Sequence, residues 1–170
     1  MAPPRGEFRI SITKEDLVFA AAHFITFAGH SCETLHGHNY RASVMLEGAL
    51  EPDSWYVADF SVVKKIMRRL TAELDHKVLL PTGNPIVAVK KEGARMTVAV
   101  SGEPRYVFPE GDCVLLPIPN TTVEMLAQHL TGRLRAELKA VGVTHLRLIE
   151  LVVEENSGQS ATYRETLSPP

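Results

Sequence analysis

The sequence predicts an α+β domain in which two helices cover one face of a four-stranded antiparallel sheet, with a small β insertion. Two segments of alternating apolar and polar residues open the chain, and two more close it. Two helical stripes lie between these pairs, separated by a stretch rich in Val, Pro and Gly. The 170 residues are expected to form one domain over residues 1–170. Such an open sheet leaves free edges, which association into a ring would remove.

The first pair of strands is expected near the N-terminus. Residues 8–12 alternate, and the strand resumes from Val18 to His23 after the charged residues 14–16. A second strand runs from His36 to about Leu46, with apolar side chains at every other position. The segment between these strands would be the turn of an antiparallel pair.

The first helix is expected to start at Asp59 and to end near Asp75, because its apolar residues recur with helical spacing. Its opposite face is basic, and the simplest interpretation is a solvated surface. The second helix is expected to open at residues 120–124, where Thr121 and Glu124 match a capping box, and to stop before Gly142.

The stretch between the helices, residues 81–118, is the expected β insertion. Residues 86–89, 96–100 and 106–108 are typical of short strands joined by turns. The final pair of strands is expected at 146–153 and 161–165.

Composition sets the class of protein. Hydrophobic residues make up 45% and charged residues 22%, and the net charge is −2, so neither a nucleic-acid partner nor binding to an anionic membrane is expected. The first residues lack the apolar core of a signal peptide, and no apolar run approaches membrane-spanning length. Two cysteines do not make a disulfide framework, which predicts a cytoplasmic protein with reduced thiols.

Histidines are concentrated between residues 19 and 40, which hold four of the chain's seven. His36 and His38 are two apart on a predicted strand, so both imidazoles point to one face. His23 on the partner strand could add a third ligand, and three imidazoles with one open position are typical of catalytic zinc. Cys32 could close the site as a fourth ligand or act beside it as a nucleophile or base. The alternative is that these histidines make only ordinary hydrogen bonds.

Two further sets of residues have both a structural and a catalytic interpretation. Asp75 and His76 could form a proton relay, although from the sequence alone a simple helix cap is favoured. Glu154 and Glu155 end a buried strand, where they could be solvated or could grip the N–H groups of a ligand.

In this order, the motifs resemble those of the 6-pyruvoyl-tetrahydropterin synthase family, which includes the 6-carboxytetrahydropterin synthases of the queuosine pathway. The resemblance covers nearly the whole chain outside residues 81–118. It rests on Ala21-Ala22-His23-Phe24, Cys32-x-x-x-His36-Gly37-His38-Asn39-Tyr40, Val57-Ala58-Asp59-Phe60, Leu74-Asp75-His76, Asn120-Thr121-Thr122-Val123-Glu124, and Glu155-Asn156 leading to Ala161-Thr162-Tyr163.

The resemblance implies the tunnelling fold (T-fold), with subunits in rings, trimers or commonly hexamers, and active sites at subunit interfaces. It implies Zn²⁺ held by His23, His36 and His38, and a pterin substrate, 7,8-dihydroneopterin triphosphate. It makes Cys32 the catalytic thiol and Asp75 with His76 the acid–base pair, overriding the helix-cap interpretation. It assigns substrate binding to three further residues: Glu155, which anchors the pterin ring, and Thr122 and Glu124, which line the pocket.

The implied reaction eliminates triphosphate, and the expected product is 6-carboxy-5,6,7,8-tetrahydropterin, with 6-pyruvoyl-tetrahydropterin as an alternative. Residues 81–118 are longer than the family's usual link, and Asn156 replaces its usual Thr. Glu33 follows Cys32 directly. In a related subgroup of the family, a glutamate replaces or adjoins the cysteine, and the enzyme cleaves the side chain of dihydroneopterin to give 6-hydroxymethyl-dihydropterin. A solvated loop residue is the favoured interpretation of Glu33. Alternatives of other classes are a zinc hydrolase that does not need Cys32 and a non-catalytic zinc- and pterin-binding protein.

Overall fold

The computed structural model describes residues 6–29 and 31–167, without the side chains of residues 14–16. Its centre is the antiparallel pair of two long strands, β1 (Phe8–His23) and β2 (His36–Gly48). Strand β8 (Leu146–Asn156) pairs antiparallel with β2, and β9 (Gln159–Thr166) pairs antiparallel with β8. These four strands confirm the predicted antiparallel sheet.

Two short strands extend this sheet beyond the four predicted. Strand β3 (Lys77–Pro81) pairs in parallel with the end of β1, and β7 (Cys113–Leu116) pairs in parallel with β3. The sheet therefore has six strands in the order β7-β3-β1-β2-β8-β9, and it is mixed rather than purely antiparallel. The expectation of only four strands was wrong because a segment of four or five residues gives no local signal of its pairing partner.

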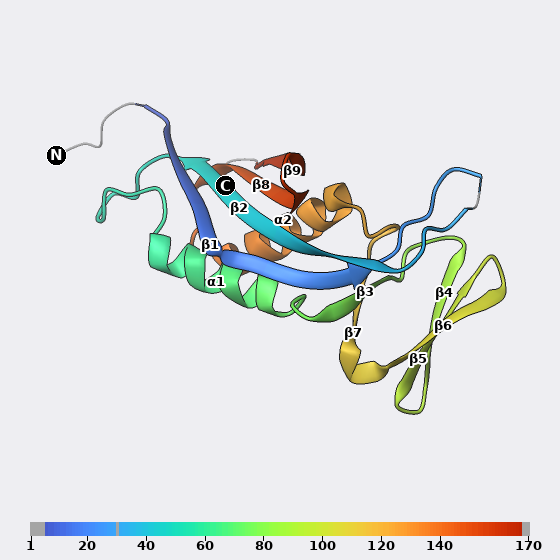
Figure 1. Cartoon of the computed structure of the whole chain (residues 1–170). Coiled ribbons are helices and arrows are strands. Elements are labelled where there is room, and N and C mark those ends of the chain that lie inside the picture. Colours follow the sequence, from blue (N-terminus) through green and yellow to red (C-terminus); the bar gives the residue numbers. More distant parts are fainter. Residues whose placement is uncertain (1–5, 30, 168–170) are drawn as a thin grey trace.

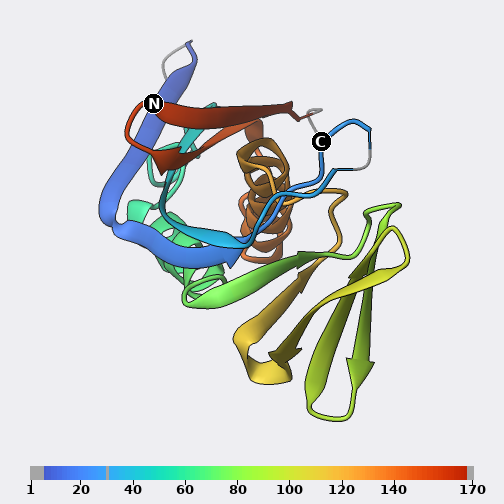
Figure 2. The ribbon, with the colours of Figure 1, turned by 45° about the vertical axis from the view of Figure 1, so that its right-hand side comes forward.

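Helices α1 (Phe60–Ala72) and α2 (Val123–Ala140) lie on the same face of the sheet (Figures 1 and 2). Their apolar stripes are buried against it, and the most buried members are Val63, Met67, Leu70, Leu126, Leu130 and Leu134. The sheet contributes a stacked pair to this core, Phe19 of β1 and Tyr40 of β2, with ring centroids 4.9 Å apart. Neither helix in the described ranges is long and apolar enough to cross a membrane.

The starts of the two helices differ in how well they were predicted. Asp59 is the N-cap of α1, and its carboxylate accepts a hydrogen bond from the Ser61 N–H at 2.7 Å, as expected. The capping box predicted for α2 was wrong. The N-cap is Thr122, whose side chain makes no capping bond, while Thr121 is buried and donates its hydroxyl to the Phe24 carbonyl at 2.8 Å.

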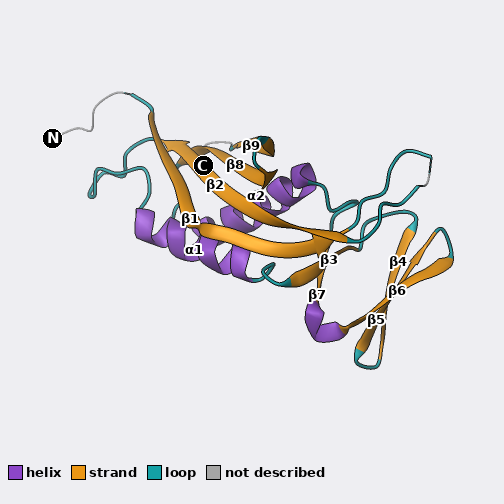
Figure 3. Ribbon diagram, viewed as in Figure 1, coloured by secondary structure: helices purple, strands orange, loops and turns teal. Residues whose placement is uncertain are grey.

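The predicted β insertion forms a separate three-stranded sheet, set to one side of the main sheet (Figure 3). Its strands are β4 (Val87–Glu92), β5 (Arg95–Val100) and β6 (Glu103–Pro109), and a short 3-10 helix, η1 (Glu110–Asp112), leads from β6 back to β7. A second hydrophobic core lies under this β4–β6 sheet and consists of Phe24, Leu80, Val87, Met96, Val98 and Val100. Phe24 directly follows His23, so this core adjoins the end of β1 where the histidines lie.

Candidate active site

Three histidines meet where β1 ends and β2 begins. His23 is opposite His36 in the strand register, and Ala21 is opposite His38, so all three imidazoles project from the same face of the sheet. One ligand nitrogen from each ring can be chosen so that all three lie within 4.8 Å of one another. The predicted triad is thus brought together by strand pairing alone.

Backbone carbonyls fix the orientation of two of these rings. The Nδ1–H of His23 donates to the Thr121 carbonyl at 2.8 Å, and the Nδ1–H of His36 donates to the Thr34 carbonyl at 2.9 Å. In these tautomers both Nε2 atoms carry lone pairs, and they face each other at 3.2 Å. Two acceptors at this distance repel each other unless a cation or a proton lies between them.

The third ring gives independent support for a metal site. His38 Nε2 is buried and makes no hydrogen bond to the described residues, although Glu155 Oε1 lies 3.4 Å away. Such orphaned buried atoms are rare and call for a missing partner. Burial is the main cause of a lowered pKa of His23, which favours the neutral form that metals bind. The donor set of three converging imidazoles therefore fits a divalent metal of the zinc type.

Glu155, the predicted substrate anchor on β8, lies beside the triad. Its Oε1 is 3.3 Å from His23 Nε2 and 3.4 Å from His38 Nε2. It also accepts a hydrogen bond from the Tyr40 hydroxyl at 3.4 Å. Burial, reinforced by the charge of Glu155, raises the pKa of Tyr40, so the hydroxyl remains protonated and able to donate. Tyr40 is a site residue to which sequence reasoning gave no role of its own, although it belongs to the motif of the family resemblance.

Cys32 and Glu33 occupy the loop that enters β2, and their side chains have different surroundings. The Glu33 carboxylate is 3.8 Å from His36 Nε2. The Cys32 thiol is half-buried, packs against the second core and donates to the Glu33 carbonyl at 3.5 Å. Burial raises the pKa of Cys32, an effect that the charge of Arg105 opposes. Of these two candidate acid–base groups, Glu33 is therefore the one directed toward the histidines.

Asp75 and His76 lie between α1 and β3, at the edge of β1. The Ala20 N–H donates to the Asp75 carboxylate at 2.8 Å, and the His76 N–H donates to the Ala20 carbonyl at 2.6 Å. His76 has a φ of 57°, which is uncommon outside glycine, and its Nδ1 is 2.9 Å from Asp75 Oδ2. The side chain of His76 is 83% exposed, so its ring is free to meet a second molecule.

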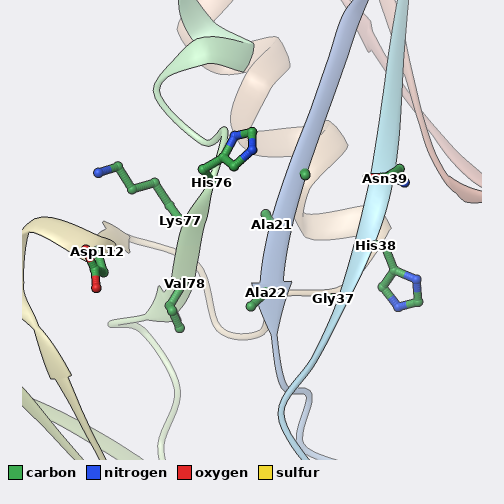
Figure 4. A pocket seen from close by; sticks show the side chains of 10 residues that line it. Ala21, Ala22, Gly37, His38, Asn39, His76, Lys77, Val78 and Asp112 are labelled. Atoms are coloured by element: carbon green, nitrogen blue, oxygen red, sulfur yellow. The ribbon is translucent and has the colours of Figure 1, made fainter.

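The strands separate this pair from the triad of the same chain. His76 borders a hollow of about 470 Å³ whose lining includes Ala20, Ala22 and Asn39, and also Ala21, Gly37 and His38. The side chains of Ala20, Ala22 and Asn39 alternate with those of Ala21 and His38, so they point to the face of the sheet opposite the histidine rings. Figure 4 shows the rings of His76 and His38 on opposite sides of the β1–β2 pair. The structure therefore does not bring the predicted acid–base pair to its own triad.

The hydrogen bond from Ala20 is the main cause of a lowered pKa of Asp75, and His76 adds to it. A carboxyl with a lowered folded-state pKa stabilises the fold above its unfolded pKa of about 3.9, and this contribution disappears as the pH falls through the folded-state value. We expect Asp75→Asn to lower the free energy of unfolding at pH 7 and to have a smaller effect at pH 3. Urea denaturation of both proteins at the two pH values measures this; an equal difference at both would contradict it.

The remaining predicted substrate-binding residues lie at the start of α2. Thr122 follows the residue whose carbonyl holds His23, and Glu124 lies in the first helical turn with an exposed side chain. Sequence reasoning missed the role of Thr121 in orienting His23, because a carbonyl contact leaves no mark in residue type.

A helix-backed sheet with a histidine triad at its central strand pair defines a T-fold protein with a candidate metal centre. The family model described as 6-pyruvoyl tetrahydropterin synthase matches residues 11–166, and the chain belongs to this family. It is 36% identical over 151 residues to the putative 6-carboxy-5,6,7,8-tetrahydropterin synthase of Methanocaldococcus jannaschii, covering 89% of this chain and 91% of the relative.

Solved structures agree over almost the full length. The crystal structure of 6-pyruvoyl tetrahydropterin synthase from Plasmodium vivax superposes with a TM-score of 0.87 at 29% identity, covering 95% of this chain and 99% of that one. Another structure of the Plasmodium vivax enzyme, with a TM-score of 0.86 at 29% identity and the same coverage, carries alanine in place of a glutamate described as a catalytic residue.

Proposed function

We propose that this protein is a zinc-dependent pterin synthase that converts 7,8-dihydroneopterin triphosphate into 6-carboxy-5,6,7,8-tetrahydropterin. The observation that carries the proposal is the triad of converging, backbone-oriented imidazoles with Glu155 beside it. The product is suggested by the name of the relative from Methanocaldococcus jannaschii. In this reaction triphosphate is eliminated, water is consumed, the side-chain carbon next to the ring is retained as the carboxylate, and the two outer carbons leave as acetaldehyde.

Each group in the site has a proposed task. His23, His36 and His38 would hold zinc, which polarises the hydroxyls of the substrate side chain and eases their deprotonation. Glu155 would anchor the pterin ring by accepting its N–H groups, with Thr122 and Glu124 lining the pocket. Cys32 would move a proton to or from the side chain, and this requires its thiol to turn toward the histidines.

A second candidate reaction is favoured by the position of Glu33. Its carboxylate lies 3.8 Å from His36 Nε2, within reach of a substrate that contacts the metal. A glutamate is also described as a catalytic residue of the similar Plasmodium vivax enzyme. With Glu33 as the acid–base group, the bond between the first and second side-chain carbons would be cleaved, giving 6-hydroxymethyl-dihydropterin and releasing the two outer carbons as glycolaldehyde or its phosphate ester.

The acid–base pair of Asp75 and His76 requires a neighbouring subunit in either reaction. Because β1 separates the pair from its own triad, we propose a ring, trimeric or hexameric, in which His76 of one chain serves the triad of another. The free edge of β9 gives such a ring a strand to pair with. We further propose that the protein acts in the cytoplasm, in queuosine biosynthesis if the carboxylated product is formed.

The product identifies the reaction. We expect the zinc-loaded protein to form 6-carboxytetrahydropterin from 7,8-dihydroneopterin triphosphate, and Cys32→Ala to reduce this by more than about 100-fold. Mass spectrometry of the products, in parallel incubations with dephosphorylated dihydroneopterin, measures it.

Glu33→Ala is the matched variant, since it alters the adjacent residue of the same loop. Formation of 6-hydroxymethyl-dihydropterin that survives Cys32→Ala but not Glu33→Ala would establish the second candidate. No product from either substrate would contradict both reactions and leave a zinc- and pterin-binding protein.

A further inference from the structure

The loop that carries Cys32 and Glu33 rests on the β4–β6 sheet. Both Cys32 and Leu35 pack against the second core, whose buried residues come largely from β4 and β5. Phe24 at the start of the loop is fully buried there, with its ring centroid 5.4 Å from that of Tyr106 on β6. The sheet is therefore in a position to control how the loop approaches the histidines.

Two adjacent residues of β6 bind the main chain of this loop directly. The Arg105 guanidinium donates from Nη2 to the carbonyls of Glu33 at 3.2 Å and Cys32 at 3.4 Å. The Tyr106 hydroxyl accepts the Leu35 N–H at 3.2 Å. Arg105 also donates from Nε to that hydroxyl at 3.1 Å, so the two side chains form one connected unit.

The same contacts fix the direction of the side chains they flank. Cys32 pairs with Thr26 in an isolated β-bridge, and neighbouring side chains of an extended segment point to opposite sides. Glu33 consequently faces His36 while Cys32 faces the second core. A rotation of this segment would turn Cys32 toward the histidines and Glu33 toward the second core, and the main-chain contacts of Arg105 and Tyr106 oppose it.

We propose that Arg105 and Tyr106 are positioning residues for the reaction, which hold the main chain of residues 32–35 so that the Glu33 carboxylate faces the histidines and the substrate. The inference rests on the proposed function in its second form, in which Glu33 is the acid–base group. Neither residue is expected to contact the substrate. The β4–β6 sheet then has a task at the active site, although it lies outside the main sheet.

The test combines a kinetic and a structural measurement on the zinc-loaded full-length protein. Tyr106→Phe removes the acceptor of the Leu35 N–H but keeps the ring, and Arg105→Lys keeps the charge but not the planar fork of donors. We expect the double variant to lower kcat by about 10–100-fold, the cost of a displacement of about 1 Å, with KM changed less than about twofold. Hydrogen–deuterium exchange should become faster in peptides that contain residues 32–35.

Arg95→Lys is the matched control, because Arg95 is an exposed arginine on β5 of the same sheet, and it should change neither measurement. Unchanged exchange at residues 32–35 in the double variant would overturn the proposal, and so would faster exchange with unchanged kcat. If the wild-type protein turns over neither pterin substrate, the proposed function fails. Faster hydrogen–deuterium exchange at residues 32–35 in the double variant would still support the inference that Arg105 and Tyr106 hold this loop.

Discussion

Replacing His38 by Ala is expected to abolish zinc binding and to reduce turnover by more than about 100-fold, since changes outside the ligand set alone cost about 10–100-fold. His38 Nε2 is the buried nitrogen without a hydrogen-bond partner, so a metal is the group that would satisfy it. Removing the ring leaves two imidazoles, too few for the three protein ligands of a catalytic zinc site.

Thermal unfolding separates loss of metal from loss of fold. Zinc at about 100 times its Kd should stabilise the wild-type protein by about 2.7 kcal/mol, and His38→Ala should lose this increment while keeping its metal-free stability. His129→Ala is the matched control, because His129 lies within α2 outside the triad. Undiminished zinc affinity of His38→Ala would contradict the assignment.

Much of the fold could be predicted because its principal elements carry strong periodic signals. The long strands β1, β2 and β8 each bury one face against the helices, which produces the alternation seen in the sequence. Strands β3 and β7 were missed for a physical reason. They pair in parallel with partners that are distant in the chain, and a segment of four or five residues can belong to a strand, a turn or a loop.

The site shows the same division between local and non-local information. The convergence of His36 and His38 follows from their two-residue spacing, and His23 follows from the antiparallel pairing. The sequence favoured Cys32 and a solvated Glu33, and it could not show which of the two faces the histidines, because a shift of one residue exchanges the faces of a strand. It also could not reveal Arg105, whose contacts reach across 72 and 73 residues of chain to the main-chain carbonyls of Glu33 and Cys32.

Two inactive variants are expected to restore activity when they share one assembly. His36→Ala removes a metal ligand, and His76→Ala removes the ring that lies on the far side of β1 from the triad of its own chain. If each active site takes its triad from one chain and His76 from another, mixed rings contain some sites with both parts intact. Equal mixing should restore about a quarter of the wild-type activity, because each site draws its two parts independently from two equal pools.

Co-expression of the two variants with different affinity tags, followed by purification through both tags, yields the mixed assemblies for kinetic assay. The double variant His36→Ala/His76→Ala, mixed with His36→Ala, is the control and should restore nothing, because no chain in that mixture has an intact triad. Full activity of His76→Ala alone would exclude the imidazole of His76 from catalysis. If the mixed assemblies are as inactive as the two parent variants, the triad and His76 act within one chain. This result would contradict the proposal that β1 separates His76 from the triad of its own chain.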